Sequence, residues 1–303
     1  MKKRLLALLI TTVVAIGAVG CSKSGEAKKS DDTFVIAYAP NESSEQSADA
    51  RNGIAKDLSE VLGVEVEEIQ ATDYNAIIEA LRTGKADMAY MGALSVALAA
   101  ERAEVEPIVM KAENGDKEQA VYHSVFITNS ENNDINSIQD IKGKTMAFVD
   151  PDSTSGNLVP TSEIMNAFPD DNLNSDILHT NGEFFEAVSY SGKHQAGLQA
   201  VIKGDVDVAP ISDQILASEI KNGNANESDI KIIHESAAIP AEAVVVSKDM
   251  DEETREKLRD FLVSYDNQDY FKLVIKNENA RFVECSMEDY EPVVELNKNI
   301  NAE

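Results

Sequence analysis

The sequence predicts an α/β protein of two lobes, with a ligand cleft between the lobes and two crossover segments that join them. Strand-like and helix-like patterns alternate along the chain, which is typical of α/β architecture with largely parallel sheets. A helix–turn–strand segment occurs twice, at residues 73–89 and 193–209, which indicates two similar lobes. The body of about 280 residues can bury a core without a disulfide, since Cys285 is its one cysteine besides Cys21.

Residues 1–20 have the features of an export signal. Basic residues at positions 2–4 precede an apolar run that is too short for a comfortable membrane span, and small residues precede Cys21. The segment AVGC resembles the lipobox of bacterial lipoproteins, which implies that Cys21 becomes the lipidated first residue of the mature protein. A plain secretory signal with an incidental cysteine is the alternative. Residues 21–33 are polar and predict a flexible tether.

The first lobe begins with a strand at residues 34–39, then a helix at 48–62, a strand at 64–69 and a helix from Asp73. That last helix opens the first copy of the repeat. The residues that the two copies share are Ala76/Ala196, Ala80/Ala200, Gly84/Gly204, Asp87/Asp207 and Ala89/Ala209. Chance similarity between two amphipathic helices is the alternative explanation.

If the two copies are equivalent, Tyr74 and His194 stand at equivalent helix starts. Strand and helix ends of this kind are where ligands bind in open α/β sheets, so both side chains are expected to face the cleft. Asp207 is interpreted as structural, because its mate Asp87 has the same setting in the other lobe.

The chain is expected to cross between the lobes twice. A strand at residues 122–128 ends near the first crossing, and the apolar run at 241–246 marks the return. The first lobe is therefore expected to comprise residues 34–128 and 242–303, and the second lobe residues 129–241. A helix follows from Asp251 to about residue 265, with acidic residues in its first turn, where they suit the helix dipole.

Residues 150–160, DPDSTSGNLVP, form the most distinctive segment of the chain. A strand ends at Val149, and a helix is predicted from near Ser155, with Pro160 in its first turns, where its missing N–H is least damaging. The loop thus presents free backbone N–H groups and three hydroxyls, and Gly156 permits close approach. A helix start of this kind binds oxyanions without a positive side chain.

Other interpretations of this loop are open. Ser and Thr at a helix start often act as caps and nothing more. A calcium loop beginning at Asp150 would lack the Gly expected at its sixth position and the Glu expected at its twelfth. A serine nucleophile paired with His194 is a further alternative, although the sequence contains no G-x-S-x-G elbow and no spacing that supports a catalytic triad.

The formal charge of −27 excludes one class of partner. Nucleic-acid binding requires clustered Lys and Arg to neutralise phosphates, and this chain has twice as many acidic as basic residues. The charge favours solubility at a cell surface. An anionic ligand would therefore have to be held by local hydrogen-bond donors.

The loop closely resembles the D-P-x-S-T-S-G-x-L-V-P loop of the phosphonate-binding proteins of ABC importers, which are type 2 periplasmic binding proteins. The segments DYNAIIEALRTGKADMAYMG, YHSVFI, GDVDVA and IPAEAVVV follow in the order of that family. The resemblance covers most of the mature chain. It implies a two-lobed type 2 periplasmic-binding-protein fold.

The resemblance also implies which residues bind the ligand. Ser153, Thr154, Ser155 and Gly156 match the loop that clasps the phosphonate oxygens. His194 matches a histidine that adds a hydrogen bond or, if protonated, a charge. The remaining matches are Tyr74 and Tyr122, whose hydroxyls reach the same head group, and Gln214 and Glu242, at positions where relatives that take aminoalkyl phosphonates use carboxylates for the ammonium.

Only one of those two carboxylates is retained, as Glu242, because Gln214 is neutral. Half of an ammonium site weakens the case for an aminophosphonate, and it leaves phosphite, phosphate, methylphosphonate or another small oxyanion open. Asp213 could substitute for the missing acid, although a neighbour on a helix points about 100° away.

The sequence thus predicts a lipid-anchored, extracytoplasmic binding protein that closes around a small phosphorus oxyanion and delivers it to an ABC permease in the membrane. We expect a monomer with no catalytic activity, no cofactor, no metal and no nucleic-acid partner. The alternatives are a binding lipoprotein for an organic ligand such as a thiamine precursor or a sulfonate, a sensor or adhesion lipoprotein without transport, and a secreted hydrolase. The lack of Trp for ligand stacking speaks against the organic ligand.

Overall fold

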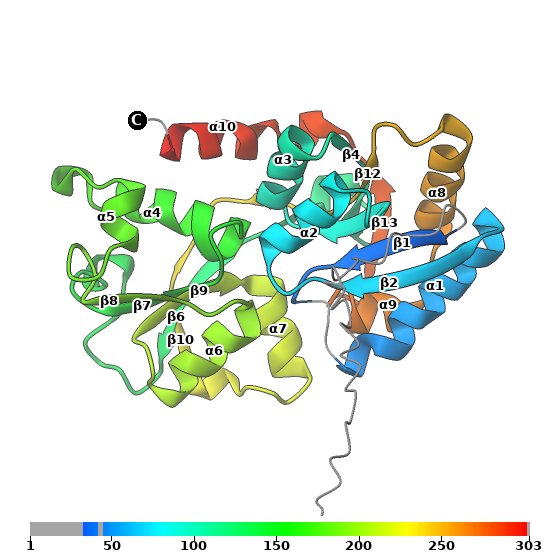
Figure 1. Cartoon of the computed structure of the whole chain (residues 1–303). Coiled ribbons are helices and arrows are strands. Elements are labelled where there is room, and N and C mark those ends of the chain that lie inside the picture. The colour runs from blue at the N-terminus through cyan, green and yellow to red at the C-terminus, as the bar shows by residue number, and fades with distance from the viewer. Residues whose placement is uncertain (1–32, 42–44, 302–303) are drawn as a thin grey trace, which may run out of the picture.

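The computed structural model describes residues 33–41 and 45–301, so the expected signal, Cys21 and almost all of the tether lie outside the described residues. The chain forms two lobes, each built around one sheet (Figure 1). No helix in these described ranges is both long enough and apolar enough to cross a membrane.

The first lobe contains a six-stranded sheet in the order β13-β4-β12-β3-β1-β2. Its strands are β1 (Thr33–Tyr38), β2 (Glu65–Gln70), β3 (Met88–Met91), β4 (Val105–Glu113), β12 (Ala243–Ser247) and β13 (Ala280–Glu284). Its helices are α1 (Ala48–Leu62), α2 (Tyr74–Arg82), α3 (Ala93–Arg102), α8 (Glu252–Ser264), α9 (Gln268–Leu273) and α10 (Glu291–Ile300). Apolar side chains of α2, α3 and α10 pack on one face of the sheet, and those of α1, α8 and α9 pack on the other.

The second lobe contains a five-stranded sheet in the order β10-β6-β9-β7-β8. Its strands are β6 (Ser124–Asn129), β7 (Thr145–Phe148), β8 (Ala187–Tyr190), β9 (Val208–Ser212) and β10 (Ile230–Glu235). Its helices are α4 (Val159–Ala167), α5 (Ser175–His179), α6 (His194–Lys203) and α7 (Asp213–Lys221), of which α4 and α5 cover one face and α6 and α7 the other.

The sheets are mixed, whereas the sequence predicted largely parallel ones. Strands β1, β2 and β3 are parallel, as are β7, β8 and β9, but β12 and β6 run antiparallel to their neighbours. The reason is the double crossing. Each of these two strands starts at the lobe boundary, where the parallel strands beside it end, so it runs in the opposite direction.

The two crossover segments lie side by side as a small antiparallel ladder of β5 (Val121–Tyr122) and β11 (Ile239–Pro240). Two further backbone hydrogen bonds extend this pairing. The Ala241 N–H donates to the Ala120 carbonyl oxygen at 2.9 Å, and the Ser236 N–H donates to the Ser124 carbonyl oxygen at 2.9 Å. The expected boundary at residue 128 is therefore wrong by several residues: the strand expected at 122–128 is split, and its larger part, β6, belongs to the second lobe.

The internal repeat is confirmed as two copies of a helix, a turn and a strand, α2–β3 and α6–β9. Gly84 and Gly204 both adopt positive φ at the helix end. The shared aspartates also act alike. The Asp87 carboxylate accepts the Val35 N–H at 2.7 Å, and the Asp207 carboxylate accepts the Thr145 N–H at 2.8 Å, so each fixes the neighbouring parallel strand. These bonds support the structural role that was predicted for Asp207.

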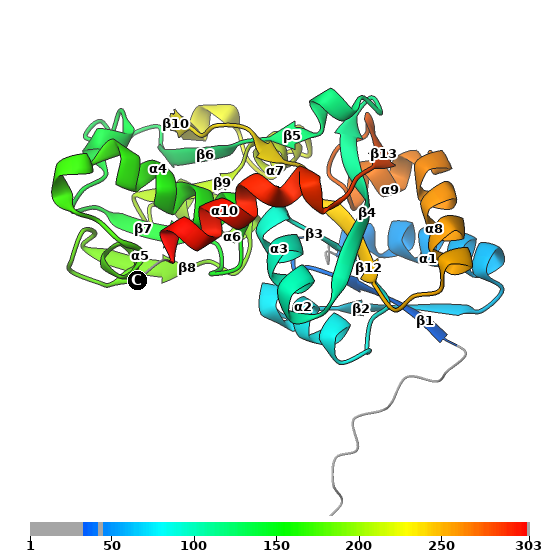
Figure 2. The ribbon, with the colours of Figure 1, turned by 90° about the horizontal axis from the view of Figure 1, so that it is seen from above.

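The lobes also meet outside the crossovers. Figure 2 shows α10 lying across the top of the molecule from the first lobe to α4 of the second. Leu158 and Val159 of the second lobe pack into the same apolar cluster as Leu94 and Val293 of the first. The lobes are thus in a closed arrangement.

Candidate functional site

A small cavity lies where the two lobes meet. Residues of both lobes line it: Ala39, Asn41, Tyr74, Met91, Gly92, Tyr122, Ser153, Thr154, Ser155, His194 and Glu242. The space open to the centre of a water-sized sphere is about 20 Å³, whereas one water needs roughly 10–15 Å³ on this measure. The closed site is therefore compact and shaped for a small group.

The second lobe contributes the hydroxyl loop. Ser153 has extended backbone and caps a π-helical turn at Thr154–Leu158, its Oγ accepting the Gly156 N–H at 3.1 Å. The turn leads into α4, with Pro160 near its start as predicted. The side chains of Ser153, Thr154 and Ser155 are all buried and line the cavity. A π-helical turn is rare and is often found at functional sites.

Gly156 has a packing role that was not predicted from the sequence. It does not line the cavity, and a Cβ added there would lie 2.4 Å from Cβ and Cγ2 of Val149. Its carbonyl oxygen also accepts the Val149 N–H at 2.9 Å. The glycine therefore lets the loop fold back against the end of β7.

The first lobe contributes the ends of its parallel strands and the helices that follow them. Tyr74 begins α2, where the Asp73 carboxylate caps the helix by accepting the Ala76 N–H at 2.7 Å. Asn41 follows β1, and its Nδ2 donates to the Tyr74 hydroxyl at 2.6 Å. The Asn41 side chain also bridges the lobes, because its Oδ1 accepts the His194 N–H at 3.3 Å. Sequence reasoning missed Asn41.

The start of α3 faces the hydroxyl loop across the lobe boundary. The Leu94 N–H, one of the free donors of the first turn, donates to Thr154 Oγ1 at 2.8 Å. The Ser95 hydroxyl donates to the Asp152 carbonyl oxygen at 3.1 Å. Both bonds exist only when the lobes are together, so they contribute directly to the closed form.

His194 is buried at the start of α6 and is neutral at physiological pH. Its Nδ1 accepts the Ser212 N–H at 3.1 Å, which leaves the proton of the neutral ring on Nε2 as a donor. Burial, followed by the positive charge of Lys111, lowers the pKa of His194 to about 3. Of the two roles expected for this residue, the structure therefore favours the hydrogen bond over the charge.

Tyr122 is buried at the first crossover and also lines the cavity. Burial and the negative charge of Glu242 raise the pKa of the Tyr122 hydroxyl, against the effect of hydrogen bonding with Ser155 and Thr154. The phenol therefore keeps its proton and can serve as a donor. Tyr122 and His194 thus provide neutral donors at the cavity that the hydroxyl loop lines, and Tyr74 lines the same cavity.

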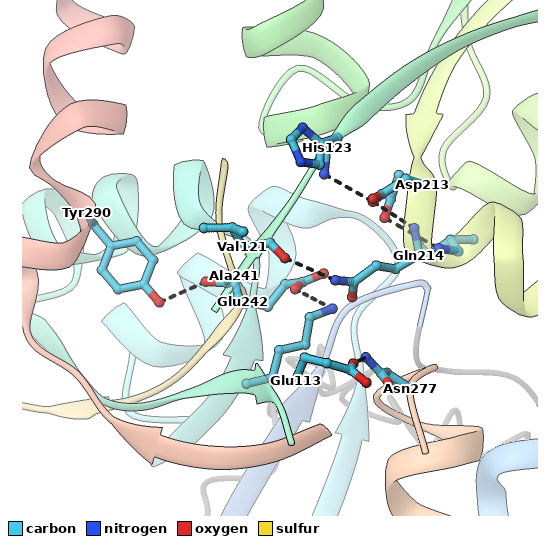
Figure 3. A network of polar contacts seen from close by, with 12 residues as sticks. Glu113, Val121, His123, Asp213, Gln214, Ala241, Glu242, Asn277 and Tyr290 are labelled. Atoms are coloured by element: carbon cyan, nitrogen blue, oxygen red, sulfur yellow. Dashed lines mark hydrogen bonds and ion pairs between the residues drawn. The ribbon is translucent and has the colours of Figure 1, made fainter. Parts of the chain in front are cut away.

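The two residues expected at the far end of the ligand are separated. Glu242 lines the cavity, but its Oε2 lies 2.6 Å from the Nζ of the buried Lys111, which sequence reasoning missed. Gln214 does not line the cavity. Figure 3 shows its side chain reaching from the start of α7 to the Val121 carbonyl oxygen, to which Nε2 donates at 3.3 Å.

Asp213 is likewise occupied and does not replace the missing acid at the cavity. Its Oδ1 accepts the His123 N–H at 3.1 Å and the Gln214 N–H at 2.8 Å (Figure 3). The aspartate thus fixes the start of α7 against the crossover strand.

Comparison with known proteins identifies the family. Residues 36–290 match the model of the ABC transporter, phosphonate, periplasmic substrate-binding protein family. The chain is 26% identical over 259 residues to the phosphate-import protein PhnD of Mycolicibacterium smegmatis, covering 81% of this chain and 77% of that protein. It is 30% identical over 226 residues to the phosphonates-binding periplasmic protein of Escherichia coli, covering 73% of this chain and 62% of that protein.

A solved structure shows the same fold. The binding-protein component of an ABC phosphonate transporter from Pseudomonas aeruginosa superposes with a TM-score of 0.75 at 25% identity, covering 88% of this chain and 85% of that one. The two-lobed type 2 periplasmic-binding-protein fold is thus confirmed. The chain belongs to the phosphonate family of periplasmic substrate-binding proteins of ABC transporters, and it is a binding protein rather than an enzyme.

Proposed function

We propose that the cavity between the lobes binds one small phosphorus oxyanion, held by neutral donors from both lobes. The observation that carries this proposal is the convergence of the Ser153, Thr154 and Ser155 side chains with Tyr74, Tyr122 and His194 around one compact cavity. Hydroxyl, phenol and imidazole N–H groups can all donate hydrogen bonds to an oxyanion. Hydrogen bonds to a charged acceptor are stronger than those between two neutral groups.

Closure of the lobes supplies the signal for transport. A ligand that contacts both lobes stabilises only the form in which they touch, and hinge closure follows from that difference. The paired segments β5 and β11 form the hinge, since they are the chain's two connections between the lobes within the described residues. The closed form then delivers its ligand to the ABC permease of the family.

The test is calorimetry on the body of the protein, beginning after Cys21, with phosphate, phosphite, methylphosphonate, 2-aminoethylphosphonate and sulfate. At least one phosphorus oxyanion is expected to bind. The variant with Ser153→Ala and Thr154→Ala should lose affinity by about 3–6 kcal/mol, from two charge-assisted hydrogen bonds at about 1.5–3 kcal/mol each.

A matched control removes two hydroxyls elsewhere. Ser59 and Thr83 donate to carbonyl oxygens in the first lobe, at 2.6 and 2.7 Å, away from the cavity. Replacing both by Ala should leave affinity unchanged. Equal affinity of the Ser153/Thr154 variant and this control would show that the loop is not the site, and binding of an organic sulfonate in place of every phosphorus oxyanion would favour the organic-ligand alternative.

We also propose that Cys21 carries a lipid anchor on the extracytoplasmic face and that the protein acts as a monomer. The support for the anchor is the AVGC segment together with the polar stretch that follows it. The full chain should partition into detergent, whereas Cys21→Ser should be released into the aqueous phase. Detection of the unchanged cysteine thiol in the exported protein would refute the anchor, and a dimer mass in light scattering would refute the monomer.

A further inference from the structure

Lys111 is a buried cation beside the cavity. It lies on β4, and its side chain is 5% exposed. Its Nζ is 2.6 Å from Oε2 of Glu242, whose side chain is 15% exposed, and its backbone N–H donates to the Glu242 carbonyl oxygen at 3.1 Å. The side-chain contact is an ion pair whose angles lie outside those of a hydrogen bond.

The charge of Lys111 acts on the groups that line the site. Its Nζ stands over the Tyr122 ring, 5.7 Å from the centroid. Lys111 also contributes to the lowered pKa of His194 and opposes the effect of burial on the pKa of Asp213. The positive charge of Lys111 therefore acts on groups at and beside the cavity, although Lys111 itself does not line it.

Stability alone does not account for this pair. Burying two charges costs desolvation that their attraction offsets only in part, and apolar residues of similar volume often serve the fold equally well. The pair does, however, solve a problem specific to an anion site. Glu242 presents a carboxylate to the cavity, and an unpaired carboxylate there would repel an anionic ligand.

The same pairing has a consequence for ligand choice. A ligand ammonium would need a free acidic acceptor, but the Glu242 carboxylate already holds an internal ammonium. Gln214 is neutral and bonded to Val121, and Asp213 already accepts two backbone N–H groups. An incoming ammonium would also meet the positive charge of Lys111.

We propose that Lys111 is a specificity-determining residue. Its ammonium group pairs with the Glu242 carboxylate, which is then not available to a ligand ammonium. The cavity therefore selects phosphorus oxyanions without an amino group over aminoalkyl phosphonates. This inference rests on the proposed function. It narrows the ligand to phosphate, phosphite or an alkylphosphonate. Lys111 thus acts by neutralising Glu242 rather than by gripping the anion itself.

The test compares ethylphosphonate with 2-aminoethylphosphonate, which differ by the amino group, using calorimetry on the wild type and three variants. The wild type should bind ethylphosphonate at least tenfold more tightly. Lys111→Met should weaken ethylphosphonate binding at least tenfold and shift the preference toward the amine. The double variant Lys111→Met with Glu242→Gln should regain the ethylphosphonate affinity, because no unpaired carboxylate is left.

Several outcomes would overturn this proposal. The first is equal affinity of the wild type for the two ligands, and the second is a Lys111→Met variant with the same ligand preference as the wild type. The third is a double variant that binds ethylphosphonate as weakly as Lys111→Met does, which would mean that the lysine contacts the anion directly. Where Lys111→Met does not fold, the Glu242→Gln variant is used instead. Its lysine is unpaired, so the preference for ethylphosphonate over 2-aminoethylphosphonate should increase at least threefold. An unchanged or smaller preference refutes the proposal.

The control is Lys221→Met. Lys221 Nζ pairs with Glu278 Oε1 at the same 2.6 Å, but both side chains are exposed, at 58% and 42%. This variant should keep the wild-type preference. Failure of the wild type to bind any phosphorus oxyanion, phosphate and phosphite included, would instead refute the proposed function, so the two failures are distinguishable.

Discussion

Ser95→Ala tests whether contacts between the lobes set the affinity for ligand. The Ser95 hydroxyl, on α3 of the first lobe, donates to the Asp152 carbonyl oxygen of the second lobe at 3.1 Å. Ser95 is buried but does not line the cavity. The substitution therefore removes a bond of the closed form without removing a ligand contact.

The expected magnitude follows from the single bond lost. An intramolecular hydrogen bond contributes roughly 0.5–1.5 kcal/mol, so the closed form should lose about that much relative to the open form, in which both groups meet water. If the open form predominates without ligand, the apparent dissociation constant rises in proportion to the lost closed population. Binding should weaken by roughly two- to twelvefold.

Calorimetry gives the affinity, and small-angle scattering with and without ligand gives the degree of closure. The control is Ser59→Ala, which removes a hydroxyl bond to the Val64 carbonyl oxygen within the first lobe. It should leave the affinity unchanged. An affinity of Ser95→Ala equal to the wild type, with the ligand-free protein open in scattering, would refute the view that these lobe contacts contribute to binding.

Two further predictions concern the loop and the histidine. Gly156→Ala places a Cβ 2.4 Å from Val149 and should destabilise the protein by about 1–3 kcal/mol in urea unfolding. The control Gly53→Ala, in α1 with open space around it, should stabilise the protein by about 0.5–1 kcal/mol. Equal stability of the two variants would contradict the packing argument. Burial lowers the pKa of His194 in the folded protein to about 3, below the ordinary value of 6.5 for a histidine. The unfolded chain therefore takes up the proton first, and stability that is present above pH 6.5 is lost as the pH falls toward 3. From pH 7 to pH 5 the wild type should lose about 2 kcal/mol more unfolding free energy than His194→Gln, at about 1.4 kcal/mol per pH unit below 6.5, and parallel pH profiles of the two proteins would show that His194 is not buried neutral.

Local patterns predicted the elements of the fold and the hydroxyl loop. The repeat could be found because each copy is a contiguous helix, turn and strand, although the N–H groups that its two aspartates accept lie far away in the sequence. The boundary at residue 128 was predicted wrongly, because the sequence of a strand that starts at a crossover does not indicate which lobe it belongs to. Pairing with Ile211 and Pro210 of β9 assigns β6 to the second sheet.

The charged end of the site could not be predicted in the same way. Lys111 and Glu242 are far apart in the sequence and meet because β12 returns from the second lobe to pair with β4. Nothing in the local pattern around Lys111 distinguishes it from a solvent-exposed lysine at a strand end. Asn41 was missed likewise, because its partners Tyr74 and His194 begin two helices that lie in different lobes.

These two missed residues bear on how a chain with a formal charge of −27 would hold the proposed anion. Asn41 links the two lobes at the cavity through neutral groups, and Lys111 pairs with Glu242, the acidic residue among the described residues that line the cavity. The cavity is then lined by the neutral imidazole of His194, the protonated phenol of Tyr122 and hydroxyl groups. Distant surface charges are largely screened at physiological ionic strength, so they act on the rate of encounter more than on the bound state. In the proposed site, recognition therefore depends on the placement of neutral donors, and the role proposed for the Lys111–Glu242 ion pair is to decide which ligand substituents those donors admit.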